Sequence, residues 1–188
     1  MTKDQLYETL NYVDASRESR LKHAKMILDD MSLLPKLIDI VFMVDDPISC
    51  RAAWVFEFVC NEYIFGLIPY LDTFTKNLKS VHLDSAVRPV AKVCEMLAKA
   101  YNSKQNKTIK NTLKAFHKEQ IIEACFDWMI NDEKIAPKAY AMNTLYLLGK
   151  EYDWVHPELK QILQQDYSHQ SAGFKARARL VLKKIKVA

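Results

Sequence analysis

Two runs of basic residues are the groups in this sequence best suited to binding a charged ligand. Neither run contains an acidic residue, and the first repeats at steps of three and four, which share one face if residues 104–118 are helical. The runs contain Lys104, Lys107, Lys110, Lys114 and Lys118, and then Lys175, Arg177, Arg179, Lys183, Lys184 and Lys186. Such a stripe binds a polyanion through counterion release, with an affinity that depends on salt. A solvated basic surface is the alternative interpretation.

Catalytic and metal-binding motifs are missing from the sequence. It has no Gly-x-Ser-x-Gly, Gly-x-x-x-x-Gly-Lys or His-Glu-x-x-His motif. The histidines are far apart, and we expect surface or capping positions for His23, His82, His117, His156 and His169. The cysteines form no Cys-x-x-Cys pair, and we expect core positions in a reducing compartment for Cys50, Cys60, Cys94 and Cys125. The sequence therefore favours a protein that is not an enzyme and predicts no cofactor and no metal.

The elements that would position these groups are helices. The chain has only three glycines, and its apolar residues recur at helical spacing. The clearest helix follows Asp46, an N-cap residue, and Pro47, which suits the first helical position. Its apolar stripe consists of Ala52, Val55, Phe56, Val59, Cys60 and Tyr63. Most aromatic residues lie on such stripes and are expected in the core, but we expect Trp54 and Tyr140 near the exposed faces of their helices.

The same pattern predicts further helices along the chain. Thr2 and Gln5 form a capping box for the first helix, Asp14 or Ser16 caps the second, and Gly149 stands where a left-handed C-cap is expected. The expected helices cover residues 2–12, 17–29, 32–44, 64–78, 84–101, 117–130, 136–148, 157–166 and 173–185.

Four of these helices can be aligned with one another. Each places a long cation before small residues, and the cations are Arg51, Arg88, Lys138 and Lys175. The intervals between them are 37, 50 and 37 residues, and the long interval contains an insertion at residues 102–116. Periods of this length with two helices per unit are typical of helical solenoids.

On these residues the chain resembles the HEAT-like branch of the α-solenoids. In the HEAT pattern an Asp stands six residues before the cation, as in Asp45 with Arg51 and Asp132 with Lys138. The other two repeats carry His82 and His169 at that place. The resemblance implies an all-α fold, a right-handed α-solenoid of about four helical pairs, with residues 1–31 as N-terminal capping helices. It also implies a ladder of Asp caps and cations that reach the neighbouring repeat, formed by Asp45, Arg51, Asp132, Lys138 and Lys175.

In such a solenoid the second helix of each pair lines the concave face, and we expect the function there. The residues expected on this face are Trp54, Glu57, Arg88, Lys92, Glu95, Asn143 and Arg179. Their charges are mixed, which suits a protein or peptide better than a phosphate track. The leading hypothesis is a non-enzymatic binding scaffold.

Two other functions come from resemblance. The HEAT-like alkylpurine DNA glycosylases cradle duplex DNA in a basic concave surface with Trp, Asp and Arg together, and nucleic acid is therefore the alternative partner. The chain also resembles small bacterial proteins that carry the name adenylosuccinate lyase. It lacks the Met-Pro-x-Lys-x-Asn core of that superfamily, so lyase activity is the least favoured of the three.

Length and composition agree with one soluble domain over residues 1–188. The net charge is +4, with −2 in residues 1–102 and +6 in residues 103–188. No stretch is long and apolar enough to cross a membrane, and the polar N-terminus is unlike a signal peptide, so we expect a cytoplasmic protein. The oligomeric state is not indicated.

Overall fold

The computed structural model describes residues 1–165, 167 and 170–185, and within these it contains helices and turns but no strand. The helices form two layers. The first helices of the pairs are α1 (Lys3–Leu10), α3 (Leu34–Val41), α5 (Leu71–Lys76), α8 (Ala115–Ile130) and α10 (Val155–Gln165). The second helices are α2 (Arg17–Asp29), α4 (Ile48–Glu62), α6 (Asp84–Asn102), α9 (Ile135–Leu148) and α11 (Ala172–Ile185). The predicted all-α solenoid is confirmed.

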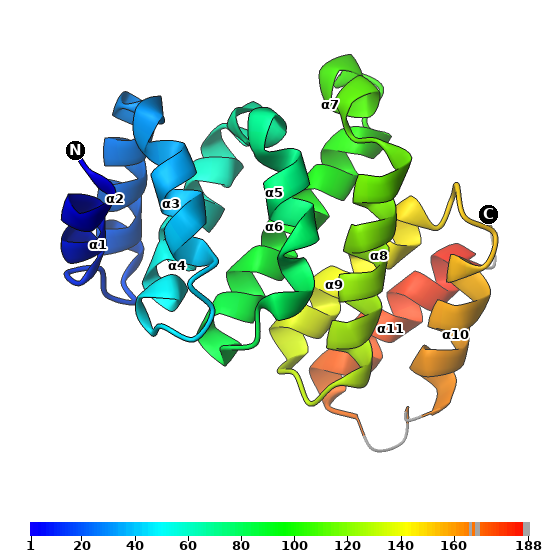
Figure 1. Cartoon of the computed structure of the whole chain (residues 1–188). Helices are drawn as coiled ribbons and strands as arrows, with labels where there is room; N and C mark the ends of the chain where they lie inside the picture. The colour runs from blue at the N-terminus through cyan, green and yellow to red at the C-terminus, as the bar shows by residue number, and fades with distance from the viewer. Residues whose placement is uncertain (166, 168–169, 186–188) are drawn as a thin grey trace.

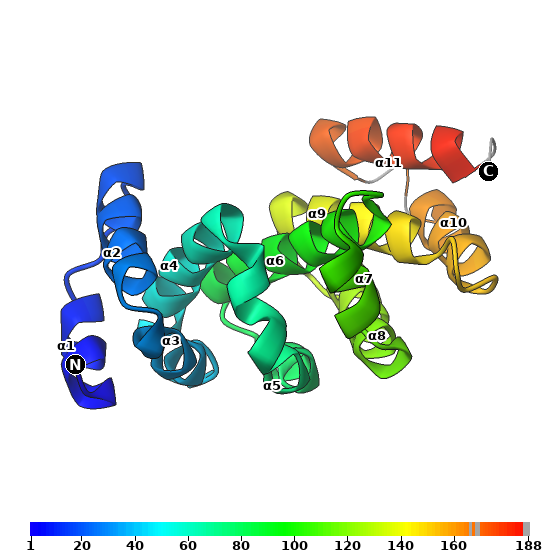
Figure 2. The ribbon, with the colours of Figure 1, turned by 90° about the horizontal axis from the view of Figure 1, so that it is seen from above.

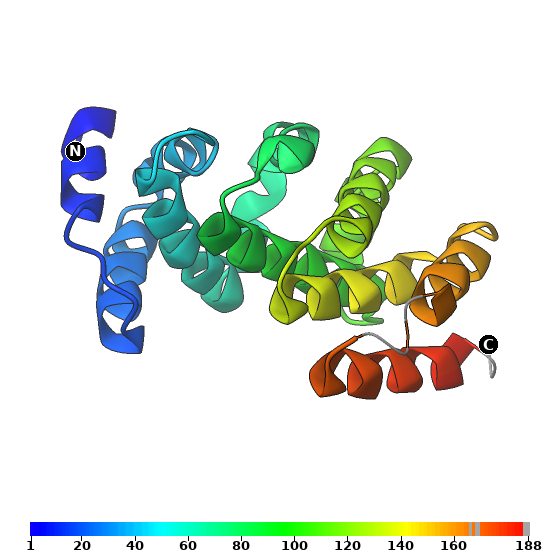
Figure 3. The same cartoon turned by 90° about the horizontal axis from the view of Figure 1, so that it is seen from below.

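The pairs stand in a row, in chain order (Figure 1). In the inner layer α2 packs on α4, α4 on α6, α6 on α9 and α9 on α11, and this layer lies on one side of the outer helices (Figure 3). Seen from above, the row curves so that the second helices line its inner side, with α2 and α11 at the two ends (Figure 2). We call this inner surface the concave face.

Short polar side chains fix where several helices begin. Thr2 forms the predicted capping box with Gln5, and the hydroxyl of Ser16 accepts the N–H of Ser19 at the start of α2. The carboxylate of Asp46 accepts the N–H of Ile48 at 2.9 Å, but Pro47 and not Asp46 occupies the N-cap position, so α4 starts at Ile48, one residue later than predicted. These contacts satisfy backbone donors that have no partner inside the helix.

The core fills the space between the two layers. The stripe of α4 is buried as predicted, and Phe56 packs against Phe74 of α5 with ring centroids 5.7 Å apart. Phe42 reaches the same ring from the preceding pair, at 6.1 Å. Tyr63 is the exception, because α4 ends at Glu62 and leaves Tyr63 47% exposed.

The single helix predicted for residues 64–78 is wrong. Residues Ile64–Tyr70 form a 3₁₀ segment, α5 covers only Leu71–Lys76, and a second 3₁₀ turn follows at Leu78–Ser80. Pro69 lies in the first segment, and a proline has no N–H for an α-helical hydrogen bond. The proline thus divides the first helix of this pair.

The insertion at residues 102–116 contains one short helix, α7 (Lys107–Thr112). Ile109 and Leu113 of this segment are buried, and α7 packs on α6. The lysine stripe predicted for residues 104–118 is therefore not one helical face. The chain is extended at Leu113 and Lys114, and α8 begins only at Ala115.

The left-handed cap predicted at Gly149 is also wrong. Gly149 has φ −62° and ψ −6°, which any residue adopts. A Cβ there would lie 2.5 Å from Cδ2 of His156 and 2.7 Å from the carbonyl oxygen of Leu145. Glycine is required at this position for space, because the His156 ring covers the end of α9.

Candidate functional site

The centre of the concave face is formed by one side of α6. Arg88, Lys92 and Glu95 follow one another along this helix at helical spacing. Arg88 reaches back to α4, where its two terminal nitrogens contact the two carboxylate oxygens of Glu57 at 2.7 and 3.4 Å. A paired contact between two planar groups fixes both side chains more firmly than a single contact would. The structure thus brings these predicted residues together.

Glu95 is the most buried of the predicted site residues, with 4% of its surface exposed. Its carboxylate accepts hydrogen bonds from Lys92 at 2.7 Å and from Asn143 of α9 at 2.9 Å, and Lys99 forms an ion pair with it at 3.0 Å. Burial by itself raises the pKa of Glu95, but the hydrogen bonds and charges of Lys92 and Lys99 outweigh burial and leave this pKa lowered. Glu95 is therefore held as a carboxylate that joins α6 to α9.

Two aromatic side chains complete this surface. The indole N–H of Trp54 donates to the carbonyl oxygen of Ser85 at 2.9 Å, and the ammonium of Lys92 lies 4.5 Å from the ring centre of Tyr140. Both aromatic residues are partly exposed, as predicted. Each is held in place by a polar contact with the neighbouring helix.

A cavity of about 470 Å³ opens on the concave face. We call it the Trp54 cavity, and its lining includes Arg20, Trp54, Asp84, Arg88, Lys134 and Pro137. Lys134 forms an ion pair with Asp84. The cavity therefore joins the start of α2, the middle of α4 and the first turns of α6 and α9. Trp54, Asp84 and Arg88 meet here, a combination of residues that the sequence alone did not assemble.

A second, smaller cavity lies beside it, between α2, α4 and α6. It has a volume of about 150 Å³ and is lined by Arg17, Glu57, Phe58, Asn61, Lys92 and Met96. We call it the Phe58 cavity. The guanidinium of Arg20 lies 5.2 Å from the ring centre of Phe58. Helix α2 thus contributes Arg17 and Arg20 to this face.

Sequence reasoning missed Arg17, Arg20, Asp84 and Lys134. Asp84 and Arg88 stand four residues apart on one helix, so this part of the site had a signal in the sequence. Arg17 and Arg20 had none, because their role depends on α2 packing beside α4. Arg179 was predicted for the site, but it is exposed on α11, where its Nε donates to the carbonyl oxygen of Lys175 at 3.3 Å.

The predicted ladder residues lie at the joints between pairs in only some cases. Arg51 reaches the preceding pair, donating to the carbonyl oxygen of Asn11 at 2.5 Å. Asp45 approaches His82 at 3.4 Å, while the carboxylate that accepts a backbone N–H at the start of α4 is that of Asp46. Lys138 is buried and Asp132 exposed.

Two repeats carry no Asp at the corresponding place. The Nζ of Lys175 lies 5.9 Å from the ring centre of Tyr167, and His169 is outside the described residues. As a whole the ladder stays a prediction.

The two basic runs are carried by different elements. Lys107 and Lys110 lie on α7, which packs on α6, with Lys104 before it and Lys114 after it, and all four are exposed. Arg177, Lys183 and Lys184 are exposed on α11, which packs on α9 and α10, and Lys186 lies outside the described residues.

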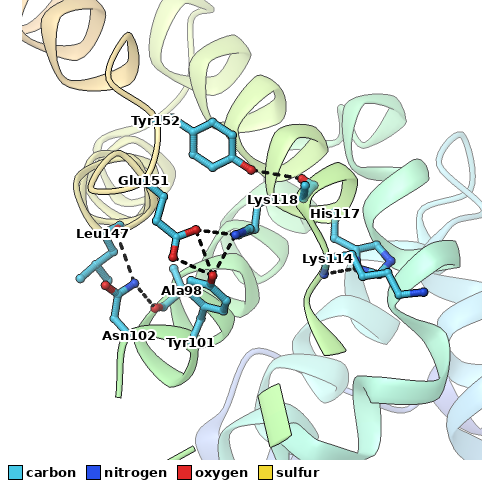
Figure 4. Close-up of polar contacts among 10 residues, drawn as sticks. Ala98, Tyr101, Asn102, Lys114, His117, Lys118, Leu147, Glu151 and Tyr152 are labelled. Atoms are coloured by element: carbon cyan, nitrogen blue, oxygen red, sulfur yellow. Dashed lines mark hydrogen bonds and ion pairs between the residues drawn. The ribbon is translucent and has the colours of Figure 1, made fainter. Parts of the chain in front are cut away.

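Lys118, counted with the first run, is buried instead in a joint between α6, α8 and the turn after α9 (Figure 4). Its ammonium contacts Glu151 at 2.5 Å and donates to the hydroxyl of Tyr101 at 2.8 Å, and that hydroxyl donates to Glu151 at 2.7 Å. Burial lowers the pKa of Lys118, but the bond to Glu151 outweighs it and leaves the pKa raised. The charge of Lys118 is therefore balanced by Glu151 inside the protein.

Neighbouring His117, at the start of α8, combines burial with a cap. Its Nδ1 accepts the N–H of Lys114 at 3.1 Å, which confirms a capping position (Figure 4). Its Nε2 lies 2.5 Å from Asp72. His23 is buried against the expectation for a surface residue, and its Nδ1 lies 2.7 Å from the carbonyl oxygen of Ser19.

The four cysteines are free, and three of them, Cys60, Cys94 and Cys125, are buried. Burial raises the pKa of each of these thiols well above its ordinary value, so the thiolate needed for reaction is disfavoured. Cys50 is partly exposed, and burial raises the pKa of its thiol too.

The described residues contain neither a membrane-spanning helix nor a cluster of metal-ligating side chains. No helix among them has the length and apolar character that crossing a membrane requires. Nor do three His, Cys, Asp or Glu side chains gather anywhere in residues 1–165, 167 and 170–185 as metal ligands would.

Comparison with known proteins agrees with the row of helical pairs. Residues 14–185 match the HEAT repeat domain family, which takes in the described pairs from α2 to α11. Neither the curated proteins nor the solved structures gave a match. Since the match covers most of the chain and the fold has the paired helices of such repeats, the chain belongs to the HEAT repeat domain family.

Proposed function

We propose that this chain is a non-enzymatic binding scaffold whose concave face holds a protein or peptide. The observation that supports this most is the contact network across α4, α6 and α9. Arg88 is fixed to Glu57, Glu95 to Asn143, and Trp54 to the backbone of Ser85. HEAT repeats commonly serve as scaffolds of this kind, and solenoids use their concave surfaces for binding.

Such a face is suited to binding because its side chains are already ordered. A partner that meets fixed side chains loses less conformational entropy on binding than one that must order them. Aromatic residues and arginine, here Trp54, Tyr140 and Arg88, also contribute most to the binding energy of protein interfaces. Mixed charges then favour a partner with a matching pattern.

The experiment is capture of cellular partners by wild-type protein and by an Arg88→Glu/Lys92→Glu variant. We expect the variant to lose partners, because it reverses two charges at the centre of the concave face. The control is Lys76→Glu/Lys160→Glu, which makes the same charge change at exposed positions of α5 and α10. Circular dichroism and urea unfolding of all proteins, with Arg88→Gln/Lys92→Gln as a neutral variant, separate lost binding from lost folding. Capture of the same partners by the Glu variant and by wild type would contradict the proposal.

Nucleic-acid binding is the second candidate, and one observation favours it. Trp54, Asp84 and Arg88 line one cavity on the concave face, and Trp, Asp and Arg are the residue types that the HEAT-like alkylpurine DNA glycosylases, to which the analogy is drawn, place together in their groove. The test is a fluorescence-anisotropy titration with duplex DNA at low salt. Binding should weaken steeply with added salt, as counterion release requires, and absence of binding at about 10 μM protein ends this candidate.

A further inference from the structure

The Trp54 cavity has an excess of positive charge. Three cations, Arg20, Arg88 and Lys134, share it with one carboxylate, that of Asp84. Lys134 pairs with Asp84, and Arg88 is paired with Glu57 of α4. Across the described part of the chain, no carboxylate lies within ion-pair distance of Arg20. The cavity therefore offers a guanidinium that forms no ion pair with an acidic side chain, although the charge of Asp14 lies near enough to interact with it.

Arg20 is held so that its charge faces a fixed direction. Its Nε donates to the carbonyl oxygen of Ser16 at 3.1 Å and its Nη2 to that of Ala15 at 2.8 Å. The plane of the group also rests near the Phe58 ring. An arginine fixed in this way can add a carboxylate without losing the rotamer entropy that a mobile side chain would lose.

The helix ends around the cavity add to this charge. The first turns of α6 and α9 both open onto it; the first turn of α9 contains no acidic residue, whereas that of α6 contains Asp84. Unpaired backbone N–H groups at a helix N-terminus carry a partial positive charge. Together with the three cations, they favour an anion between α2 and α9.

We infer that the Trp54 cavity receives a carboxylate side chain of an acidic peptide segment, an inference that rests on the proposed function. The carboxylate would lie between Arg20, Arg88 and Lys134. Trp54 and Pro137 supply apolar walls for the methylene groups of a Glu or Asp side chain. A charge-assisted bond from a planar guanidinium suits a carboxylate well.

The neighbouring Phe58 cavity is placed to receive a second side chain of the same peptide. Trp54 and Phe58 are one helical turn apart on α4, as Arg88 and Lys92 are on α6. One turn is about 5.4 Å, close to the roughly 6.6 Å between alternate side chains of an extended peptide. Phe58 and Met96 give this second cavity an apolar lining. The segment expected is thus an acidic residue and an apolar residue two positions apart, in either order along the peptide.

A peptide agrees with this face better than a nucleic acid does. Asp84 lines the Trp54 cavity and Glu57 lines the Phe58 cavity, and a continuous phosphate backbone across this face would approach both carboxylates. A single side chain meets only the cationic part of the cavity. The volume of about 470 Å³ also suits one or two side chains rather than a duplex.

The experiment uses fluorescein-labelled peptides with Glu-Ser-Leu or with Leu-Ser-Glu in a Gly-Ser background, and matched peptides with Gln in place of Glu. Anisotropy titrations compare the wild-type chain with Arg20→Gln and with Lys22→Gln, an exposed lysine of the same helix that lies outside both cavities. We expect Arg20→Gln to weaken binding of the acidic peptide by about tenfold or more, since hydrogen bonds between charged groups are lost. Lys22→Gln should leave the affinity for the acidic peptide unchanged. The Gln peptide should bind the wild-type chain and Arg20→Gln weakly and with equal affinity.

A second variant separates a loss of binding from a loss of folding. Arg20 also bonds the backbone before α2, so Lys134→Gln, at an exposed side chain, removes a charge from the cavity without touching that turn. We expect a loss in the same direction. Urea unfolding of each variant shows whether the fold is kept.

The outcomes distinguish this inference from the proposed function. Equal binding of the Glu and Gln peptides, no effect of Arg20→Gln, or no peptide binding overturns the acidic-segment inference. If cellular partners are still lost with Arg88→Glu/Lys92→Glu in that case, the concave face binds a partner of other chemistry. Duplex DNA that binds in an Arg20-dependent manner, without peptide binding, also overturns it and supports the second candidate.

Discussion

Glu95 shows how single residues organise the concave face. Its carboxylate is almost completely buried, yet it contacts two lysines and an asparagine at distances between 2.7 and 3.0 Å. A buried charge is tolerated only when partners replace its water shell. If Glu95 changes, Lys92 loses its carboxylate partner and Asn143 its acceptor.

Glu95→Gln should therefore lower the free energy of unfolding by about 2 kcal/mol at pH 7. The amide keeps the shape but carries no charge, and its NH2 group must face either Lys92 at one former oxygen position or Lys99 and Asn143 at the other. Urea unfolding measures the change, and the exposed Glu119→Gln on α8 is the matched control. Equal midpoints for the two variants would contradict this role of Glu95.

The same variant makes a prediction about pH. The pKa of Glu95 is lowered below its ordinary value of 4.5, so its contribution to stability is complete above about pH 4.5 and is lost as the pH falls through the lowered pKa. The gap in unfolding free energy between wild type and Glu95→Gln should narrow as the pH falls below 4.5. A gap that stays constant down to acid unfolding would show that the carboxylate form is not what stabilises.

At the scale of elements, the end of α9 depends on a glycine for reasons of space. Gly149→Ala should lower the free energy of unfolding by about 1–3 kcal/mol, because the new methyl group overlaps the His156 ring and the Leu145 carbonyl. Gly173→Ala in α11 is the matched control. Its Cβ would meet Cγ1 of Ile135 at an ordinary 3.6 Å, so we expect a gain of up to about 1 kcal/mol. Thermal unfolding of both variants tests this, and a shift of the same sign for both would argue against it.

The joint between α6, α8 and the turn after α9 gives a second prediction for elements. Lys118→Met and Glu151→Gln should be coupled, because their charges contact each other at 2.5 Å. A double-mutant cycle in urea should yield a coupling free energy of about 1 kcal/mol, modest because Glu151 is partly in solvent. Additive effects of the two substitutions would mean that the ion pair does not hold the joint together.

Much of this arrangement was predictable from the sequence, and the failures have physical causes. Helices 17–29 and 84–101 were placed almost to the residue, since a cap and an apolar period mark them locally. The single helix predicted for residues 64–78 is wrong because the helical spacing of the apolar residues was given more weight than Pro69, which cannot donate an α-helical hydrogen bond. The prediction that the first lysine run forms one surface stripe is wrong partly because Lys118 is buried and pairs with Glu151, a residue distant in sequence.

The candidate site was only partly predictable for the same reason. Glu57, Arg88, Lys92, Glu95 and Asn143 share periodic positions on second helices, and the structure brings them together. Arg20 and Lys134 come from the ends of other helices, and only the packing of α2 and α9 brings them to the Trp54 cavity. Local pattern identifies faces of helices, whereas a cavity depends on several helices at once.

At the scale of the whole molecule, the central helices pack against a preceding and a following pair of the row, whereas the end helices pack against a neighbouring pair on one side only. Helix α6 packs between α4 and α9, whereas α11 packs on α9 and α10 and buries only Phe174, Ala178 and Val181 among its described residues. In repeat proteins stability is a sum over each unit and its nearest neighbours. Hydrogen exchange measured by mass spectrometry should therefore show the slowest exchange in α4, α6 and α9 and faster exchange in α1 and α11. Uniform protection along the chain would instead indicate one cooperative unit.

The row of second helices has a mechanical consequence. Each helix in it leans on the next, so a rotation of a few degrees at one joint is added to the rotations at the others. Small rotations at the joints therefore sum to a large change in the distance between α2 and α11. Substitutions at the joints, far from Trp54 and Arg20, should change how closely the concave face can surround a bound partner.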